Sequence, residues 1–239
     1  MTEQIDGVVT PSRASRTSSR PTTVEVDRAF TAFVGEPGFP CLGAKGAVGR
    51  HGYRIGVYGA LAGVRATTVL ASELSDFLHR SPGDGAGFTA FVAVFPVRPP
   101  AGEGNFERRL WKQLQRLHEC DPAAGEWDPS VSDDPHDPHF SFSFDRHALF
   151  VVGLHPDSSR LARRFRWPSL VFNPHAQFQR LRAEGRFDRL RTRIREKEIE
   201  LQGSLNPNLA DFGEASEARQ YSGRETEADW SCPFHRRPP

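Results

Sequence analysis

Residues 87–97, GFTAFVAVFPV, limit the possible folds more than any other stretch of the sequence. Almost every side chain in this run is apolar, whereas a strand with one solvent-facing side alternates apolar and polar residues. The run therefore predicts a strand in the centre of a sheet. Such a sheet needs neighbouring strands and a layer of helices to cover it.

Four other segments have the composition or the alternation of strands. They are YRIGVYGAL at 53–61, HFSFSFD at 139–145, LFVVGL at 149–154 and WPSLVF at 167–172. In the second of these, the three phenylalanines Phe140, Phe142 and Phe144 fall on one side. The short DRHA connection to the next segment predicts a hairpin.

About six helices are expected between and after the strands. They are predicted within 26–34, 66–80, 105–119, 174–184 and 186–202, with a shorter arginine-rich one after His155. Residues 35–49, GEPGFPCLGAKGAVG, are predicted to be a Gly/Pro loop. The elements do not alternate as βαβ units, so we expect a single α+β domain with a mainly antiparallel sheet packed against helices.

The ends of the chain differ in composition from its centre. Residues 1–23 are rich in Ser, Thr, Arg and Pro and predict a disordered tail. Residues 236–239 predict a loose C-terminal tail, which leaves one domain over 24–235. No apolar run approaches the roughly 20 residues that cross a bilayer.

Charge and cysteine content bound the partners and the compartment. The formal net charge of the 239 residues is +1, which argues against whole-surface attraction to nucleic acid or to a membrane. Three scattered cysteines do not predict a disulfide framework, and no secretory signal begins the sequence. A cytoplasmic location is expected, with a homodimer as one option for the oligomeric state.

Two histidines stand where predicted strands run into short turns, His155 in GLHPDSS and His175 in FNPHAQF. Such positions are common in functional sites, although a lone histidine is more often structural. Arg160, Arg163 and Arg164 follow His155 and would share one face of a helix, either as a solvated surface or as a grip for anions. Together with many aromatic residues, this set suits haem, which has an apolar body and anionic ends.

The segment DDPHDPHF offers a second candidate site. Its metal-ligand residue types are Asp134, His136, Asp137 and His139. Pro135 and Pro138 keep the segment extended, so a solvated loop is favoured over a metal site. A metal-dependent hydrolase built on these residues is the third-ranked interpretation of the sequence.

Residues 204–224, SLNPNLADFGEASEARQYSGR, hold a cluster of charges. The carboxylates Asp211, Glu214 and Glu217 recur at three-residue spacing, and Arg219 and Arg224 follow. Carboxylates this close repel one another unless they are exposed or paired with a cation. The cation could be an arginine of the preceding helix, such as Arg189, Arg193 or Arg195, or it could be a ligand such as a guanidinium.

Several long blocks between Phe39 and Phe234 resemble the YqcI/YcgG family. They are FPC followed shortly by GA, FVVGLHPDSSRLARRF, WPSLVFNPHAQFQRLR, LQGSLNPNLADFGEASEARQYSGR and the terminal WSCPF. The family includes haem-dependent N-oxygenases that act on arginine or on related guanidine compounds of natural-product biosynthesis. Residues 121–138 lie outside the matching blocks and are expected to be a lid or a loop.

The resemblance implies a haem-dependent monooxygenase that binds haem b, dioxygen and a small guanidino substrate. Oxygen would be placed on a guanidino nitrogen, with electrons from an external donor or reductase. Substrate binding would use Asp211, Glu214 or Glu217 for the guanidinium and Arg219 or Arg224 for the carboxylate of the substrate. His155 is the first candidate for the iron ligand and His175 the second, and Cys41 and Cys232 also lie in matching blocks. The alternative is a haem-binding carrier or sensor without turnover.

Overall fold

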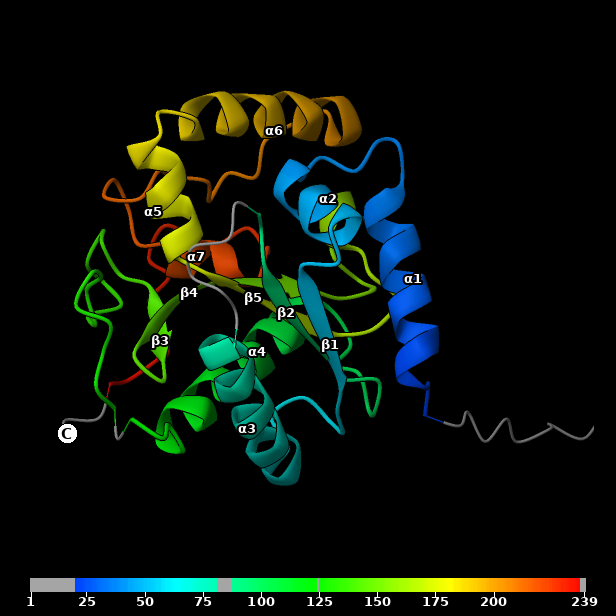
Figure 1. Cartoon of the computed structure of the whole chain (residues 1–239), viewed down its shortest axis with the longest axis vertical. Coiled ribbons are helices and arrows are strands. Elements are labelled where there is room, and N and C mark those ends of the chain that lie inside the picture. Colours follow the sequence, from blue (N-terminus) through cyan, green and yellow to red (C-terminus); the bar gives the residue numbers. More distant parts are fainter. Residues whose placement is uncertain (1–19, 81–86, 124, 237–239) are drawn as a thin grey trace, which may run out of the picture.

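The computed structural model describes residues 20–80, 87–123 and 125–236. Most of the expected N-terminal tail, residues 1–19, lies outside the described ranges, as do residues 237–239. The described chain forms one α+β domain in which helices pack on both faces of a central sheet (Figure 1). No helix within the described ranges is long and apolar enough to cross a membrane.

All five predicted strands are present. They are β1 (Tyr53–Val57), β2 (Ala90–Val94), β3 (Phe142–Phe144), β4 (His147–Leu154) and β5 (Ser169–Pro174). Their order in the sheet is β1-β2-β5-β4-β3, and only the β1–β2 pair is parallel. The expectation of a mainly antiparallel mixed sheet is therefore confirmed.

Strand β2 occupies the interior position that its apolar composition predicts. All five of its residues are buried, and it pairs with β1 on one side and with β5 on the other. The predicted hairpin is the β3–β4 pair, whose two turn residues Asp145 and Arg146 have φ angles of 52° and 62°. Left-handed backbone at both positions is the geometry of the two-residue turn that matches strand twist.

The helices form two layers. They are α1 (Thr23–Gly35), α2 (Leu42–Gly49), α3 (Val64–Arg80), α4 (Glu103–Glu119), α5 (Ala176–Ala183), α6 (Phe187–Gln202) and α7 (Ala218–Tyr221). Helices α3 and α4 cover one face, where the predicted apolar side of α4 is buried in one core cluster with side chains of β2, β3, β4 and β5. Helices α1 and α2 lie on the other face, with α5 and α6 at its upper edge in Figure 1.

The prediction of a Gly/Pro loop over residues 35–49 is wrong for its second half, which forms helix α2. Cys41 precedes the helix, and its Sγ accepts a hydrogen bond from the backbone N–H of Ala44 at 3.4 Å. Added Cβ atoms at Gly43 and Gly46 would lie 3.4 Å and 3.3 Å from the Phe88 ring. The small residues let the helix approach this ring closely, so a tertiary contact outweighs the low helix propensity of glycine.

The arginine-rich helix expected after His155 is reduced to the 3-10 turn η1 (Leu161–Arg163). The backbone carbonyl of Arg163 accepts from the N–H of His155, which closes a loop and ends the turn. Arg160, Arg163 and Arg164 therefore do not share a helical face. The acidic segment is likewise mostly irregular, because Gly213 has a φ of 93° and α7 begins only at Ala218.

Candidate functional site

A cavity of about 360 Å³ lies between the sheet and the helices α1, α2, α5 and α6. Its floor is made by side chains of β4 and β5, among them Phe150, Val152 and Val171. Aromatic rings from several elements form the walls, including Phe33, Phe39, Phe88, Phe178 and Phe212. A largely apolar cavity of this size with a few polar groups is typical of small-molecule sites.

His175 is the histidine that lines this cavity among the described residues. It follows β5 directly, and its backbone N–H donates to the carbonyl of Ala148, which fixes the position of the ring at the end of the strand. The side chain is almost fully buried, and within the described chain its Nδ1 has no hydrogen-bond partner. Burial, assisted by the charge of Arg182, lowers the pKa of His175 to about 4, so the ring is neutral near pH 7.

Glu217 lies beside His175 in the same cavity. Its Oε1 accepts hydrogen bonds from Ser141 Oγ at 2.7 Å and from the Tyr221 hydroxyl at 2.6 Å, whereas its Oε2 is 3.8 Å from His175 Nε2. Burial raises the pKa of Glu217 to about 7. Two adjacent titratable groups shifted in opposite senses, inside a cavity, are a physical mark of a functional site.

The two shifts predict opposite effects of pH on stability. Glu217 keeps a proton in the fold between pH 4.5 and about 7, where the unfolded chain has lost it, so its contribution falls as pH rises. His175 is neutral in the fold between about pH 4 and 6.5, where the unfolded chain binds a proton, so its contribution rises with pH.

Between pH 4.5 and 6.5 the two slopes should offset each other in the native protein. Relative to it, the free energy of unfolding of Glu217→Gln should rise across this range, and that of His175→Gln should fall. Urea unfolding of the apo-protein at several pH values measures both. If the free energies of unfolding of the two variants change with pH in the same way, then neither pKa shift is present.

Arginine side chains from different elements line the cavity. Arg163 donates to the carbonyls of Tyr221 at 3.0 Å and Gly153 at 3.4 Å, and burial lowers its pKa to about 10, so it stays charged. The Arg182 guanidinium lies 4.2 Å from the centre of the Phe187 ring and 5.4 Å from that of Phe212. Within the described residues, neither arginine forms an ion pair, which leaves two cations facing the cavity.

The three predicted carboxylates have three different environments. Asp211 lines the cavity and pairs with Arg191 and, at 2.9 Å, with Arg195. Glu214 is exposed and accepts from the backbone N–H of Asp211. Only Glu217 is a cavity carboxylate without an arginine ion pair in the described chain. An ion pair with arginines of the preceding helix therefore explains Asp211, but it does not explain Glu214 or Glu217.

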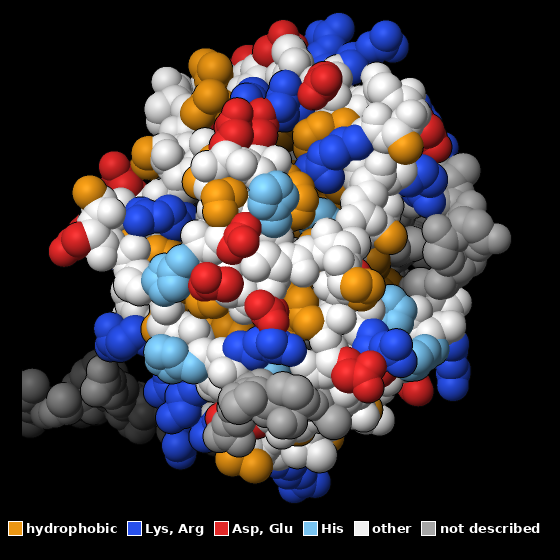
Figure 2. Space-filling view, turned by 90° about the vertical axis from the view of Figure 1, so that its left-hand side faces the viewer, with side chains coloured by type: hydrophobic (Ala, Val, Ile, Leu, Met, Phe, Trp, Pro, Cys, Tyr) orange, Lys and Arg blue, Asp and Glu red, His pale blue; other side chains and the backbone are white. Residues whose placement is uncertain are grey.

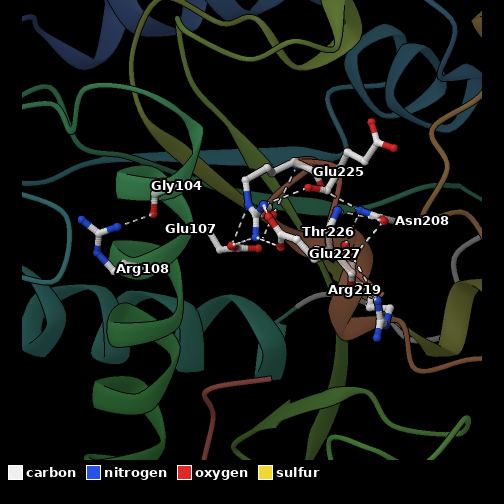
Figure 3. A network of polar contacts seen from close by, with 10 residues as sticks. Gly104, Glu107, Arg108, Asn208, Arg219, Glu225, Thr226 and Glu227 are labelled. Carbon is white, nitrogen blue, oxygen red and sulfur yellow. Dashed lines mark hydrogen bonds and ion pairs between the residues drawn. The ribbon is translucent and has the colours of Figure 1, made fainter. Parts of the chain in front are cut away.

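Four other predicted arginines hold the fold together away from the cavity lining. Arg160 pairs with Glu198 at 2.6 Å, and Arg164 donates to the carbonyl of Ser158 at 2.9 Å. Arg219 donates to the backbone carbonyls of residues 227, 228 and 230, and Arg224 pairs with Glu107 and Glu227. Figure 3 shows Glu107, Glu227 and Arg219 within this polar network.

A sequence model of the YqcI/YcgG family matches residues 30–235. The chain belongs to the YqcI/YcgG family. The matched residues include all five strands and most of the cavity lining, so the cavity is part of the YqcI/YcgG domain. A search of curated proteins found no significant match, nor did a search of solved structures.

The four candidate iron ligands divide between the two faces of the YqcI/YcgG sheet. His155 is fully buried, stacks on Phe106 of α4 with ring centres 4.3 Å apart, and does not line the cavity. Cys232 is buried on the same side, where burial raises the pKa of its thiol to about 12. Cys41 does line the cavity, but burial also raises its thiol pKa. His175 and Cys41 are thus the candidates within reach of a cavity ligand.

The Asp/Pro/His segment of the insert at 121–138 forms turns. Asp134 and Asp137 accept hydrogen bonds from the backbone N–H groups of His136 at 2.9 Å and His139 at 2.7 Å. Across the described ranges, no group of three or more His, Cys, Asp or Glu side chains is placed to hold a metal ion. Figure 2 shows carboxylates, histidines and basic side chains interspersed on one face.

Sequence reasoning missed Arg182, although its spacing carried a signal. His175, Phe178 and Arg182 recur at the three- and four-residue intervals that place side chains on one face of a helix. All three line the cavity. The same interval links Arg191 and Arg195 on α6, which both reach Asp211.

Proposed function

We propose that this protein is a haem-dependent N-oxygenase that places oxygen on a guanidino nitrogen of L-arginine or of a related guanidine compound. The observation that carries the proposal is that a neutral histidine, His175, lies beside a buried carboxylate, Glu217, inside one aromatic cavity, and that no arginine of the described residues forms an ion pair with this carboxylate. Dioxygen and an external electron donor complete the reaction. A haem-binding carrier or sensor is the alternative, and it differs from the proposal only in lacking turnover.

Three properties of the cavity support a haem b group. Nδ1 of His175 is a buried lone-pair donor without a partner in the described chain, and a neutral ring is the form that binds iron. Phenylalanine rings line the space and suit an apolar macrocycle. Arg163 and Arg182 offer cations for its two carboxylates. Bound there, haem would supply activation of dioxygen and a route for electrons.

The remaining groups can position a guanidino substrate. Glu217 would accept hydrogen bonds from the guanidinium, and the nearby cation would favour its ionised form by lowering the raised pKa. Ser141 and Tyr221 hold one of its oxygens, which orients the other toward His175. The apolar walls exclude water and strengthen this charge pair.

The cofactor is tested by titrating haemin into the purified apo-protein. An intense Soret band that saturates near one equivalent per chain is expected, because one cavity carries the histidine and the arginines. Metal analysis of protein purified from cells supplemented with a haem precursor gives an independent measure of iron. A linear, non-saturating titration would remove haem from the proposal.

Turnover is tested with Glu217→Gln, assayed for N-hydroxylated arginine by mass spectrometry. Loss of one partner of a buried charge pair costs about 2–5 kcal/mol, so product should fall below detection while the haem spectrum is kept. Glu214→Gln is the matched control, since Glu214 is exposed and should retain activity. If both variants form as much product as each other, the guanidinium is bound elsewhere. If the native protein forms no product in the presence of a reductant, the haem-binding carrier or sensor is favoured.

A further inference from the structure

A line of oxidisable aromatic side chains starts at the cavity carboxylate Glu217. The hydroxyl of Tyr221 donates to Glu217 Oε1 at 2.6 Å. The ring of Tyr221 stacks on Trp111 with centres 5.6 Å apart and an interplanar angle of 22°. Trp111 in turn lies 6.1 Å from Trp230, centre to centre. The line thus joins the cavity to the far side of the sheet.

Burial changes along this line from complete to partial. Tyr221 is fully buried and Trp111 is 2% exposed, whereas Trp230 is only partly buried. The guanidinium of Arg219 lies 5.4 Å from the centre of the Trp230 ring and donates to the carbonyl of Trp230, which fixes this outermost member. The inner members are shielded from water, and the outer member can meet a reagent in solution.

The hydrogen bonding of the line suits electron transfer. Tyrosine and tryptophan are the side chains most easily oxidised by one electron, apart from cysteine. A tyrosine loses its electron readily only when a base takes the phenolic proton. Glu217 stands at hydrogen-bond distance for this purpose, and it can accept the proton above about pH 7, where it is ionised. Trp111 Nε1 has no partner in the described chain, although a buried indole N–H usually finds one.

We propose that Tyr221, Trp111 and Trp230 form a relay that carries single electrons from the protein surface to the cavity. Tyr221 would give one electron to an oxidant in the cavity, of the class that iron and dioxygen generate, while its phenolic proton moves to ionised Glu217 Oε1. Trp111 gives an electron to the tyrosyl radical and the proton returns. Trp230 reduces the Trp111 radical cation, and an external one-electron reductant restores Trp230.

The steps balance without a further reagent. One electron passes from the external reductant to the cavity oxidant, and the single proton moves to Glu217 and back. Burial raises the pKa of Tyr221 well above its usual value, so the phenol cannot release its proton ahead of its electron. The source of the oxidant rests on the proposed function, but the relay itself is made only of side chains of this chain.

The relay is tested in the apo-protein, above pH 7 so that Glu217 is ionised, with a soluble ruthenium photo-oxidant, which draws electrons from surface groups. This oxidation runs the same line in reverse, so a tryptophanyl radical should form first and convert to a tyrosyl radical. Transient absorption follows the conversion. Tyr221→Phe should abolish the conversion, and Trp111→Phe and Trp230→Phe should each slow it by about tenfold or more. Glu217→Gln should slow it as well, because the proton acceptor is lost.

Trp127→Phe is the control, since Trp127 is also partly buried against the same core but lies outside the line. Its conversion rate should match that of the native protein. A tyrosyl signal that survives Tyr221→Phe would belong to Tyr53 or Tyr58 and would overturn the relay, as would unchanged rates in both Trp111→Phe and Trp230→Phe. Thermal melts check that each variant folds. Trp230→Phe changes a partly exposed side chain, so this variant keeps the inner core intact.

The two proposals can fail separately. The photochemical experiment uses no haem, so a failed haemin titration leaves its result standing. If the tryptophanyl radical does not convert to a tyrosyl radical, N-oxygenation can still occur with electrons that reach the cavity by another route.

Discussion

His175→Ala is expected to lose the saturating Soret response to haemin. The variant removes the neutral, unpartnered ring nitrogen that lines the cavity, while the aromatic walls and arginines stay in place. Haemin should then associate only weakly, with a broad spectrum that lacks a histidine-ligated spin state. Titration followed by absorption and electron paramagnetic resonance spectra measures this loss.

His155→Ala is the matched control, because His155 is an equally buried histidine at the end of the neighbouring strand. It stacks on Phe106 and does not line the cavity, so its removal should lower the melting temperature and leave the Soret band unchanged. The reverse result, with His155→Ala losing the band and His175→Ala keeping it, would favour the ranking that the sequence alone gave. Loss only in Cys41→Ala would point to a thiol ligand.

The largest expected effect on stability is that of Glu107→Ala. Glu107 is 7% exposed, accepts from Ser222 Oγ at 2.9 Å and pairs with Arg224 at 2.8 Å (Figure 3). Removing it leaves the buried Ser222 hydroxyl without its acceptor and Arg224 with Glu227 as its remaining carboxylate, at a cost of about 1–3 kcal/mol. Urea unfolding should show this as a lower midpoint with an unchanged slope.

Glu227→Gln removes the other carboxylate that pairs with Arg224, and its side chain is 64% exposed. An exposed pair contributes about 0–1 kcal/mol, so this variant should unfold close to the native midpoint. A third variant, Arg224→Gln, tests the role in substrate binding that the sequence predicted for Arg224. If Arg224→Gln unfolds normally but loses arginine binding, then that first assignment is right.

The sequence predicted the sheet well because its signals were local. The apolar run of β2, the alternation around β3 and the short link to β4 each depend on residues next to one another in the chain. Helix α2 escaped prediction because its stability depends on Phe88, which is far away in sequence. The irregular path after His155 has a local cause, since the carbonyl of Arg163 pairs with the His155 backbone rather than within a helix.

The sequence predicted which types of residue form the site better than it predicted where the fold places them. His175 and Glu217 were both named, but their meeting requires β5 and the segment before α7 to lie side by side. Of the other charges, Asp211 and Arg163 line the cavity, while Arg160, Arg164, Arg219 and Arg224 serve the fold. Charge patterns along a sequence do not distinguish a ligand pair from a structural pair, because each uses the same fork geometry.

Helix α6 has no fully buried residue, although it forms part of the cavity wall. Its ties to the domain include the ion pairs of Arg191 and Arg195 with Asp211 and of Glu198 with Arg160. Lifting it would break these ion pairs but would uncover no fully buried side chain of the helix itself. The haem of the proposed function could enter the cavity by this route. Dissolved salt, by screening these ion pairs, should hasten its uptake.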